Sequence, residues 1–203
     1  WCIDPKKIEK KISKNTSLII ATHLYGNVCE MKIINKIAKK NGIPILEDSA
    51  EALGSKINNK LCGTLSDIGC FSFHGSKTLT TGEGGMIVTN KKNIYEKCKT
   101  LNNHGRTAKE YKFFTASYVG FKYKMTNLQA AIGLSQLKDL NKKISKKREI
   151  FKNYKKNFSD IKIKMNTEKK DEFNSYWMTN IVFDEKYKIN IKKLMNFLEK
   201  RNI

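Results

Sequence analysis

The amino-acid sequence predicts an α/β domain built on a largely parallel sheet. Three observations support this prediction: short apolar runs alternate with amphipathic stretches, polar loops separate them, and the 203 residues include only two prolines. Strands that alternate with helices are typical of parallel sheets with helical crossovers. A chain of this length can also bury a sizeable core.

The individual elements follow from local patterns. Residues 4–13 are predicted as a helix, because Asp4 can cap its start and Pro5 suits its first position. The next helix places Met31, Ile34, Ile37 and Ala38 on one face and ends at Gly42. The predicted strands are 17–21, 43–46, 68–73 and 86–89, and the further predicted helices are 92–102 and a long lysine-rich one over about 126–157.

The long helix is expected to leave the sheet, which divides the chain. Residues 1–140 then form the central part of a large domain, and residues 141–203 form a connecting helix and the beginning of a small α+β domain. The latter is predicted to contain a strand over 176–183 and a helix over 190–201. Because the chain opens on Trp1 and stops as a helix closes, we expect a fragment that lacks parts at both ends.

The net charge of +21 raises the possibility of a nucleic-acid partner. The excess comes mostly from lysines spread along the chain, and arginine, which binds phosphate and guanine in a bidentate manner, is scarce. We therefore favour a lysine-rich solvated surface and expect no specific nucleic-acid site. A basic, non-catalytic nucleic-acid-binding module is the alternative from another class.

No apolar run approaches the roughly 20 residues that cross a bilayer, and the first residues do not resemble a signal peptide. The five cysteines show no paired spacing, so we expect neither a metal site nor a redox motif. These features predict a cytoplasmic protein with reduced thiols and no membrane partner.

Polar side chains at the predicted strand ends suggest a site for chemistry. Asp48 follows an apolar strand, where a carboxylate can pair with a protonated pyridine nitrogen. Lys77 lies in a loop of small and hydroxyl residues, where an amine can form a Schiff base with an aldehyde. Ser72 can donate to a phosphate, whereas Glu47 is expected in a surface turn or a helix cap.

Longer motifs extend this reading. The sequence contains EDSAEALGS at 47–55, CFSFHGSKTLTTGEGGMIVTN at 70–90, NNHGR at 102–106 and VGFKYKMTNLQAAIGLSQL at 119–137. Together with WCIDPKKIEKKI, ATHLYGN and SYWMTNIVFDE, they resemble the DegT/DnrJ/EryC1/StrS family of sugar aminotransferases. The resemblance covers essentially the whole chain.

The resemblance implies the large domain of a fold type I (aspartate aminotransferase) enzyme that depends on pyridoxal 5′-phosphate (PLP), followed by the start of its small domain. It implies a glutamate-dependent amination of a nucleotide-linked 4-keto-6-deoxy sugar in a homodimer with shared active sites. Within the family, the sequence motifs of this chain are most similar to those of members that aminate GDP-linked 4-keto-6-deoxymannose to perosamine. The same chemistry on a dTDP- or UDP-linked keto sugar, or on a 3-keto sugar, is the alternative.

The resemblance also implies roles for residues around the cofactor. Lys77 matches the lysine that binds PLP covalently and later moves protons, and Asp48 matches the carboxylate beside the pyridine nitrogen. Glu51 matches the position beside the ring and its 3′-oxygen, and Ser72 matches the phosphate-binding serine. Lys122 lies where many members have an asparagine that reaches the phosphate of the partner subunit's cofactor.

Two further expectations follow from the family pattern. His23 and Tyr25 lie in a loop that faces the site in relatives, and they are expected to touch substrate. One branch of the family has histidine in place of the lysine and catalyses a dehydration, so Lys77 favours transamination. Because family members have further segments on both sides, we expect this chain alone to bind PLP poorly and to be inactive.

Overall fold

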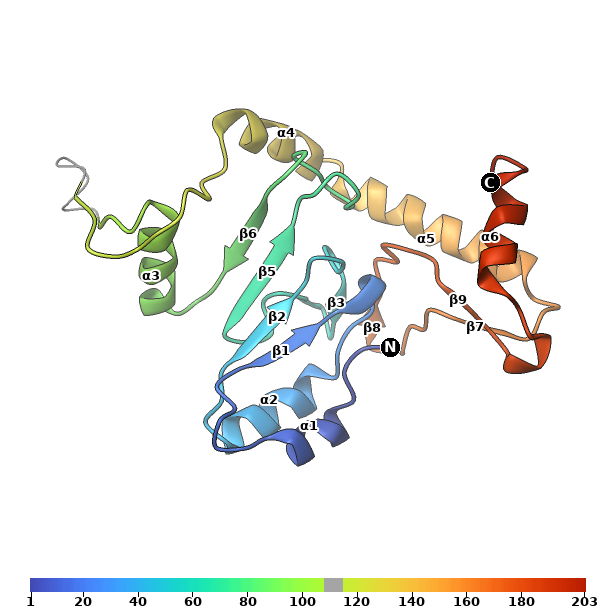
Figure 1. The fold of residues 1–203 in the computed structure, drawn as a ribbon, viewed down its shortest axis with the longest axis horizontal. Helices are drawn as coiled ribbons and strands as arrows, with labels where there is room; N and C mark the ends of the chain where they lie inside the picture. Colours follow the sequence, from blue (N-terminus) through green and yellow to red (C-terminus); the bar gives the residue numbers. More distant parts are fainter. Residues whose placement is uncertain (108–114) are drawn as a thin grey trace.

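A four-stranded sheet forms the centre of the computed structural model, which describes residues 1–107 and 115–203 (Figure 1). The strand order is β1 (Ile19–Thr22), β2 (Ile45–Asp48), β5 (Ile68–Ser72) and β6 (Gly85–Val88). The first three strands run parallel, and β6 pairs with β5 in the antiparallel direction. The prediction of a largely parallel α/β sheet is therefore confirmed.

Two helices cover one face of this sheet next to β1 and β2, α1 (Pro5–Lys11) and α2 (Met31–Lys40) (Figure 1). As predicted, the Asp4 side chain caps α1, accepting a hydrogen bond from the backbone N–H of Lys6 at 2.9 Å. The four apolar residues predicted on one face of α2 are all buried in the main hydrophobic core. The periodicity of the sequence thus located the core on this side of the sheet.

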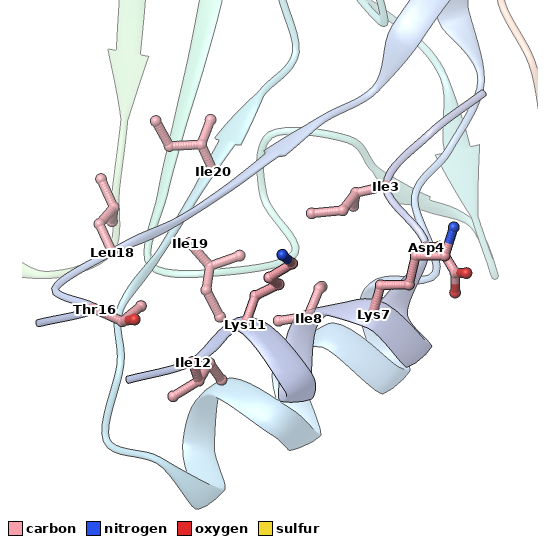
Figure 2. A pocket seen from close by; sticks show the side chains of 10 residues that line it. All are labelled: Ile3, Asp4, Lys7, Ile8, Lys11, Ile12, Thr16, Leu18, Ile19 and Ile20. Carbon is pink, nitrogen blue, oxygen red and sulfur yellow. The ribbon is translucent and has the colours of Figure 1, made fainter. Parts of the chain in front are cut away.

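A cavity of about 370 Å³ opens between α1 and β1 (Figure 2). Half of its lining residues are isoleucines, including Ile8, Ile12 and Ile19, and two lysines of α1 are also among them. None of the predicted site residues is among those that line it, so the cavity is separate from the predicted site.

A second, three-stranded sheet was not predicted. It consists of β4 (Lys60–Leu61), β3 (Lys56–Ile57) and β8 (Glu172–Phe173) in that order. Asn58 and Asn59 join β3 to β4 with φ angles of 47° and 63°, the left-handed conformation of a tight hairpin turn. Since β8 pairs with β3, a late part of the chain is tied to the loop that follows β2. The division into domains at residue 140 stays a prediction.

The predicted helix over 126–157 is wrong in one respect, because the structure has two helices there. These are α4 (Asn127–Leu137) and α5 (Leu140–Asn157). Thr126 and Gln129 form a capping box that fixes the start of α4. Helical periodicity continues across the short break, which explains why the sequence pattern did not reveal it.

Some of the remaining elements were predicted, and others, among them two 3₁₀ turns, were not. The helix α3 (Lys92–Asn102) has the predicted bounds, and η1 (Leu24–Gly26) is a short 3₁₀ turn after β1. The strand predicted over 176–183 is shorter, since only its last residues form β9, which pairs with an unpredicted β7. The C-terminal elements are β7 (Ile163–Met165), β9 (Ile181–Phe183), η3 (Glu185–Tyr187) and α6 (Ile191–Glu199).

The expectations about the cysteines and about membrane-spanning segments can be compared with the structure. All five cysteines are free thiols. Within residues 1–107 and 115–203, no helix combines the length and the apolar character needed to cross a membrane.

Candidate active site

The carboxyl ends of three parallel strands meet at one edge of the central sheet. In the register of the sheet, Thr22 of β1 lies beside Asp48 of β2, and Asp48 lies beside Cys70 of β5. Ser72 ends β5 two residues further on. Loops leave the sheet at this edge, where α/β proteins commonly bind their ligands. The predicted positions Asp48 and Ser72 therefore lie at one edge, as the sequence indicated.

Asp48 keeps part of its carboxylate available. Its Oδ1 accepts a hydrogen bond from the backbone N–H of Ala50 at 3.1 Å and a weak one from the thiol of Cys70 at 3.9 Å. No partner for Oδ2 is found among the described residues. Burial, and then the negative charge of Asp48, raise the pKa of the Cys70 thiol, so this neighbour stays uncharged.

Lys77 and Glu51 come together in the loops beyond the sheet. The Nζ atom of Lys77 lies 3.7 Å from Oε1 of Glu51, and the two side chains are only 15% and 19% exposed. The same Nζ lies 4.0 Å from the centre of the Trp177 ring. The amine thus lies between a carboxylate and an aromatic face.

Tyr25 supports Glu51 from the loop after β1. Its φ angle of 58° lies in the left-handed region, which costs a non-glycine residue energy. In this conformation its backbone N–H donates to Oε2 of Glu51 at 2.7 Å. The Tyr25 ring stacks on Trp177, with 6.4 Å between ring centres and an interplanar angle of 9°. The expectation that Tyr25 lies near the site is consistent with these contacts, and its contact with substrate stays a prediction.

Trp177 is a site residue that the sequence analysis missed. It lies after α5, far from Lys77 in sequence, and is 9% exposed. Its indole N–H donates to the backbone carbonyl of Ser76 at 3.0 Å, directly before Lys77. The motif SYWMTN was assigned to a strand, and nothing in its alternation distinguishes this ring from a core residue.

The segment before Trp177 is anchored to the loops that surround the site. The backbone N–H of Ser175 donates to the hydroxyl of Ser55 at 3.0 Å, and that hydroxyl donates to the carbonyl of Gly26 at 2.6 Å. Gly26 has a φ angle of 90°, and a Cβ there would lie 2.9 Å from the backbone nitrogen of Tyr176. Only glycine allows this approach, so the HLYGN motif has a structural role next to Tyr25.

Ser72 retains the hydrogen-bonding capacity that a phosphate needs. Its hydroxyl oxygen accepts a hydrogen bond from the backbone N–H of His74 at 3.3 Å. The hydroxyl proton can therefore still be donated. Ser72 is half-buried at the edge of the sheet, and its phosphate-binding role stays a prediction.

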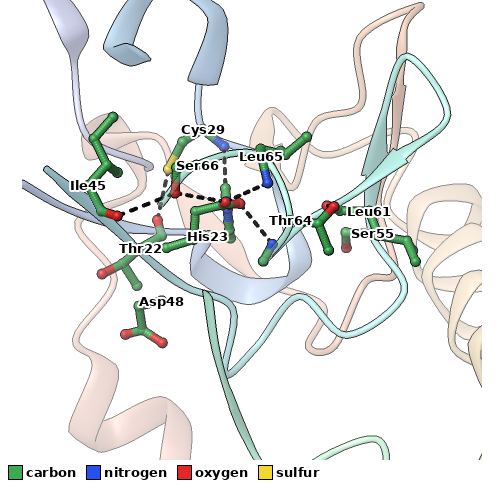
Figure 3. A network of polar contacts seen from close by, with 12 residues as sticks. Thr22, His23, Cys29, Ile45, Asp48, Ser55, Leu61, Thr64, Leu65 and Ser66 are labelled. Carbon is green, nitrogen blue, oxygen red and sulfur yellow. Dashed lines mark hydrogen bonds and ion pairs between the residues drawn. The ribbon is translucent and has the colours of Figure 1, made fainter. Parts of the chain in front are cut away.

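His23 does not lie where the resemblance placed it. The side chain is 0% exposed, its Nδ1 accepts a hydrogen bond from the backbone N–H of Cys29 at 3.1 Å, and its Nε2 lies 3.0 Å from Oε2 of Glu47 (Figure 3). Because both ring nitrogens have protein partners, the expectation that His23 touches substrate is not supported. His23 instead joins the loop after β1 to the end of β2.

Glu47 is also different from the prediction, which placed it in a surface turn or a cap. It is fully buried and accepts hydrogen bonds from the backbone N–H groups of Gly63 at 2.7 Å and Leu65 at 2.6 Å, and from the hydroxyl of Ser66 at 2.9 Å. Burial raises the pKa of Glu47, but the hydrogen bonds from His23 and Gly63 outweigh this effect and hold the pKa below its usual value. The carboxylate therefore organises the 61–66 loop.

Lys122 lies outside this group of residues. It is exposed and forms an isolated backbone bridge with Asn103, at the end of α3. This part of the chain lies beyond β6, which is the outermost strand on the side of the sheet away from β1 (Figure 1). The contact predicted for Lys122 involves a partner subunit, so it stays a prediction.

The residues at this edge match the chemical groups of PLP. Lys77 offers an amine for the aldehyde, and Oδ2 of Asp48, which has no partner in the part of the chain that the structure describes, offers a negative charge for a protonated ring nitrogen. Ser72 offers a hydroxyl for the phosphate. The donor set therefore fits the predicted cofactor.

Comparisons with known proteins agree with the family resemblance of the sequence motifs. The sequence profile of the DegT/DnrJ/EryC1/StrS aminotransferase family matches residues 1–203. The chain is 44% identical over 182 residues to the GDP-perosamine synthase of Escherichia coli O157:H7, covering 90% of this chain and 49% of the relative. The chain spans about half the length of the curated relatives that it matches first.

Two solved structures are similar along almost the whole chain. Helicobacter pylori PseC, an aminotransferase involved in the biosynthesis of pseudoaminic acid, has a TM-score of 0.90 and 31% identity, covering 98% of this chain and 54% of that one. The GDP-4-keto-6-deoxy-D-mannose-3-dehydratase of E. coli, with bound hydrated PLP, has a TM-score of 0.88 and 26% identity, covering 100% and 56%. The predicted fold class is confirmed by these similarities.

Proposed function

Because this chain belongs to the DegT/DnrJ/EryC1/StrS aminotransferase family, we propose that it is part of a PLP-dependent enzyme that aminates a nucleotide-linked keto sugar. The observation that carries the proposal is the placement of Lys77, with its amine 3.7 Å from Glu51, beyond the sheet edge at which Asp48 and Ser72 lie. A covalent binding residue, a partner for the ring nitrogen and a phosphate donor are thereby available together.

The substrate that we propose is a GDP-linked 4-keto-6-deoxy sugar, and the amino donor is L-glutamate. The support is the 44% identity to a GDP-perosamine synthase. The second candidate is a UDP-linked keto sugar, since a UDP-4-amino-4,6-dideoxy-N-acetyl-β-L-altrosamine transaminase is 39% identical over 171 residues. Turnover of GDP-, UDP- and dTDP-linked keto sugars by the full-length protein distinguishes these candidates.

The chain's own residues divide the work in this proposal. When bound, PLP supplies an electron sink next to the carbon that loses a proton. Lys77 would hold the cofactor, and its amine would carry the proton that leaves the donor carbon and the proton that is added to the sugar carbon. Asp48 keeps the ring nitrogen protonated, and Ser72 holds the phosphate. Loss of Lys77 should stop both halves of the reaction, whereas loss of Asp48 should slow both.

A dehydratase in the same family is the main competing activity, because one of the similar structures is a 3-dehydratase. The presence of Lys77 favours amination, since a lysine amine can both bind the cofactor and be displaced by an incoming amino group. We further propose a homodimer in which Lys122 reaches the phosphate of the other subunit's cofactor, and a cytoplasmic location.

The deciding experiment is the visible absorption spectrum of the full-length protein with PLP, measured beside Lys77→Ala and a control, Lys60→Ala. Lys60 is an exposed lysine of β4. We expect wild type and Lys60→Ala to show a visible band that bleaches when glutamate is added, and Lys77→Ala to lack it. Identical spectra for wild type and Lys77→Ala would overturn the proposed role of Lys77.

A further inference from the structure

Trp177 contacts the Lys77 loop at two points. Its ring centre lies 4.0 Å from the Nζ atom of Lys77, and its indole N–H donates to the carbonyl of Ser76 at 3.0 Å. A tryptophan face is the side-chain surface that attracts a cation most strongly. This hydrogen bond fixes the indole relative to Ser76, the residue before Lys77. The ring therefore cannot move away from the amine unless the hydrogen bond breaks.

Four contacts link Lys77, Glu51, Tyr25 and Trp177 in a closed ring. The amine is next to Glu51, Glu51 accepts the backbone N–H of Tyr25, the Tyr25 ring stacks on Trp177, and Trp177 faces the amine again. A free lysine side chain loses rotamer entropy when it is fixed. Here the carboxylate and the ring offset this cost, so one position of the amine is selected.

Trp177 itself is held by the segment on which it lies. Its carbonyl accepts a hydrogen bond from Nζ of Lys147 at 3.0 Å. Asn174 and Ser175 are both fully buried, and Ser175 is hydrogen-bonded to Ser55 through its backbone N–H. The indole is therefore a fixed surface, against which a flexible lysine is ordered.

We infer that Trp177 is a positioning residue, which holds the amine of Lys77 beside Glu51 whenever that amine is not bonded to the cofactor. The inference rests on the proposed function. In that reaction the donor's C–H bond would break and an N–H bond would form on Lys77, and PLP, when bound, would supply the sink for the electron pair. Lys77 becomes positively charged in this step, and the Trp177 face and Glu51 stabilise that charge.

The first part of the test examines the contact in the protein without cofactor. Lysines are methylated with ¹³C, and the Lys77 resonance is identified by its absence in Lys77→Arg. We expect the ring current of Trp177 to shift this resonance upfield in wild type. The shift should disappear in Trp177→Leu and should persist in Trp1→Phe, which changes the other tryptophan of the chain.

The second part measures the reaction with glutamate in single turnovers of the PLP-loaded, full-length protein. We expect Trp177→Leu to lower the limiting rate about tenfold, the size of a desolvated cation–π contact, with the KM for glutamate within about twofold. Trp177→Phe keeps an aromatic face and the apolar packing, so it should recover most of the rate. Borohydride reduction followed by peptide mapping should show PLP on Lys77 in every variant.

The outcomes separate the inference from the proposed function. If borohydride links PLP to Lys77 but Trp177→Leu reacts as fast as wild type, the inference is wrong and the proposed function stands. A Lys77 resonance that is unchanged in Trp177→Leu would overturn the inference as well. If wild type never carries PLP on Lys77, the proposed function is wrong, and the role of Trp177 in it falls too.

Discussion

Two glutamates four residues apart have opposite surroundings. Glu47 is fully buried, and its oxygens accept four hydrogen bonds of 2.6–3.0 Å, all from within the protein. Glu51 is 19% exposed, accepts one hydrogen bond from Tyr25, and meets Lys77 at the longer distance of 3.7 Å. A carboxylate with every acceptor position used holds loops together, whereas one with capacity to spare can respond to a ligand.

Each of these glutamates pairs with one basic side chain, Glu47 with His23 and Glu51 with Lys77, and the two pairs differ in the same way. In the His23–Glu47 pair both side chains are 0% exposed, and both ring nitrogens of His23 are occupied. In the Lys77–Glu51 pair both groups can still reach solvent. The buried pair therefore belongs to the framework, and the partly exposed pair belongs to the chemistry that we propose.

The largest expected effect separates the two glutamates by stability. Glu47→Gln places an amide among hydrogen-bond donors in a buried site, so we expect it to lower the free energy of unfolding by about 3 kcal/mol. Glu51→Gln keeps its acceptor for Tyr25, and we expect a loss below about 1 kcal/mol. Denaturant unfolding of the full-length protein without cofactor measures both values.

In the visible spectrum of bound PLP, we expect the opposite ranking of the same two variants, with the larger change in Glu51→Gln. Among molecules that remain folded, we expect Glu51→Gln to change the visible spectrum of bound PLP, and Glu47→Gln to leave it as in wild type. Equal losses of stability in the two variants would contradict the distinction between framework and site.

The sequence predicted the framework well where a local pattern has one structural solution. Alternating apolar runs located β1, β2, β5 and β6, and the capping pair Asp4 and Pro5 located the start of α1. The burial of Glu47 was missed, because its partners Gly63 and Leu65 are backbone groups of a loop, which side-chain patterns do not reveal. A buried charge depends on tertiary contacts and not on periodicity.

The candidate site was predicted in part. Asp48, Ser72 and Lys77 were identified from their positions after strands and from the family resemblance. The structure has Asp48 and Ser72 at the ends of neighbouring strands and Lys77 beside Glu51, and the roles of these residues stay predictions. His23 was assigned to that site because the matching loop faces the site in relatives, but here its side chain is buried and hydrogen-bonded to Cys29 and Glu47. Trp177 was missed because it reaches Lys77 only through the long return of the chain after α5.

A smaller effect concerns the anchor of the segment that holds Trp177. Arg148 of α5 forms a two-pronged ion pair with Glu168, donates to the carbonyl of Asn174 at 2.6 Å and stacks on Phe173. We expect Arg148→Lys to lower the free energy of unfolding by about 1–2 kcal/mol, because lysine cannot reproduce the fork or the stacking. Denaturant unfolding measures it.

The matched control lies on the same helix. Lys146 pairs with Glu149 on the exposed surface of α5, where ion pairs contribute little. We expect Lys146→Ala to leave stability unchanged within error. A loss in Lys146→Ala as large as that in Arg148→Lys would show that helix charge, and not the anchor, is responsible.

The smallest effect is a change in acid sensitivity. The hydrogen bonds to Glu47 outweigh its burial and hold its pKa below the ordinary glutamate range. On acidification the unfolded chain therefore takes up a proton at this residue before the folded protein does. The stability that Glu47 provides is complete above the ordinary glutamate pKa of about 4.3 and is lost as the pH falls through the lowered folded value.

Glu47→Gln cannot take up this proton, so its stability should decline less steeply than that of wild type on the acidic side of the ordinary glutamate pKa. Glu51→Gln should keep the wild-type slope. The measurement is the free energy of unfolding as a function of pH for the three proteins. Parallel curves for wild type and Glu47→Gln would mean that the folded protein and the unfolded chain protonate Glu47 alike, which the four short hydrogen bonds around it argue against.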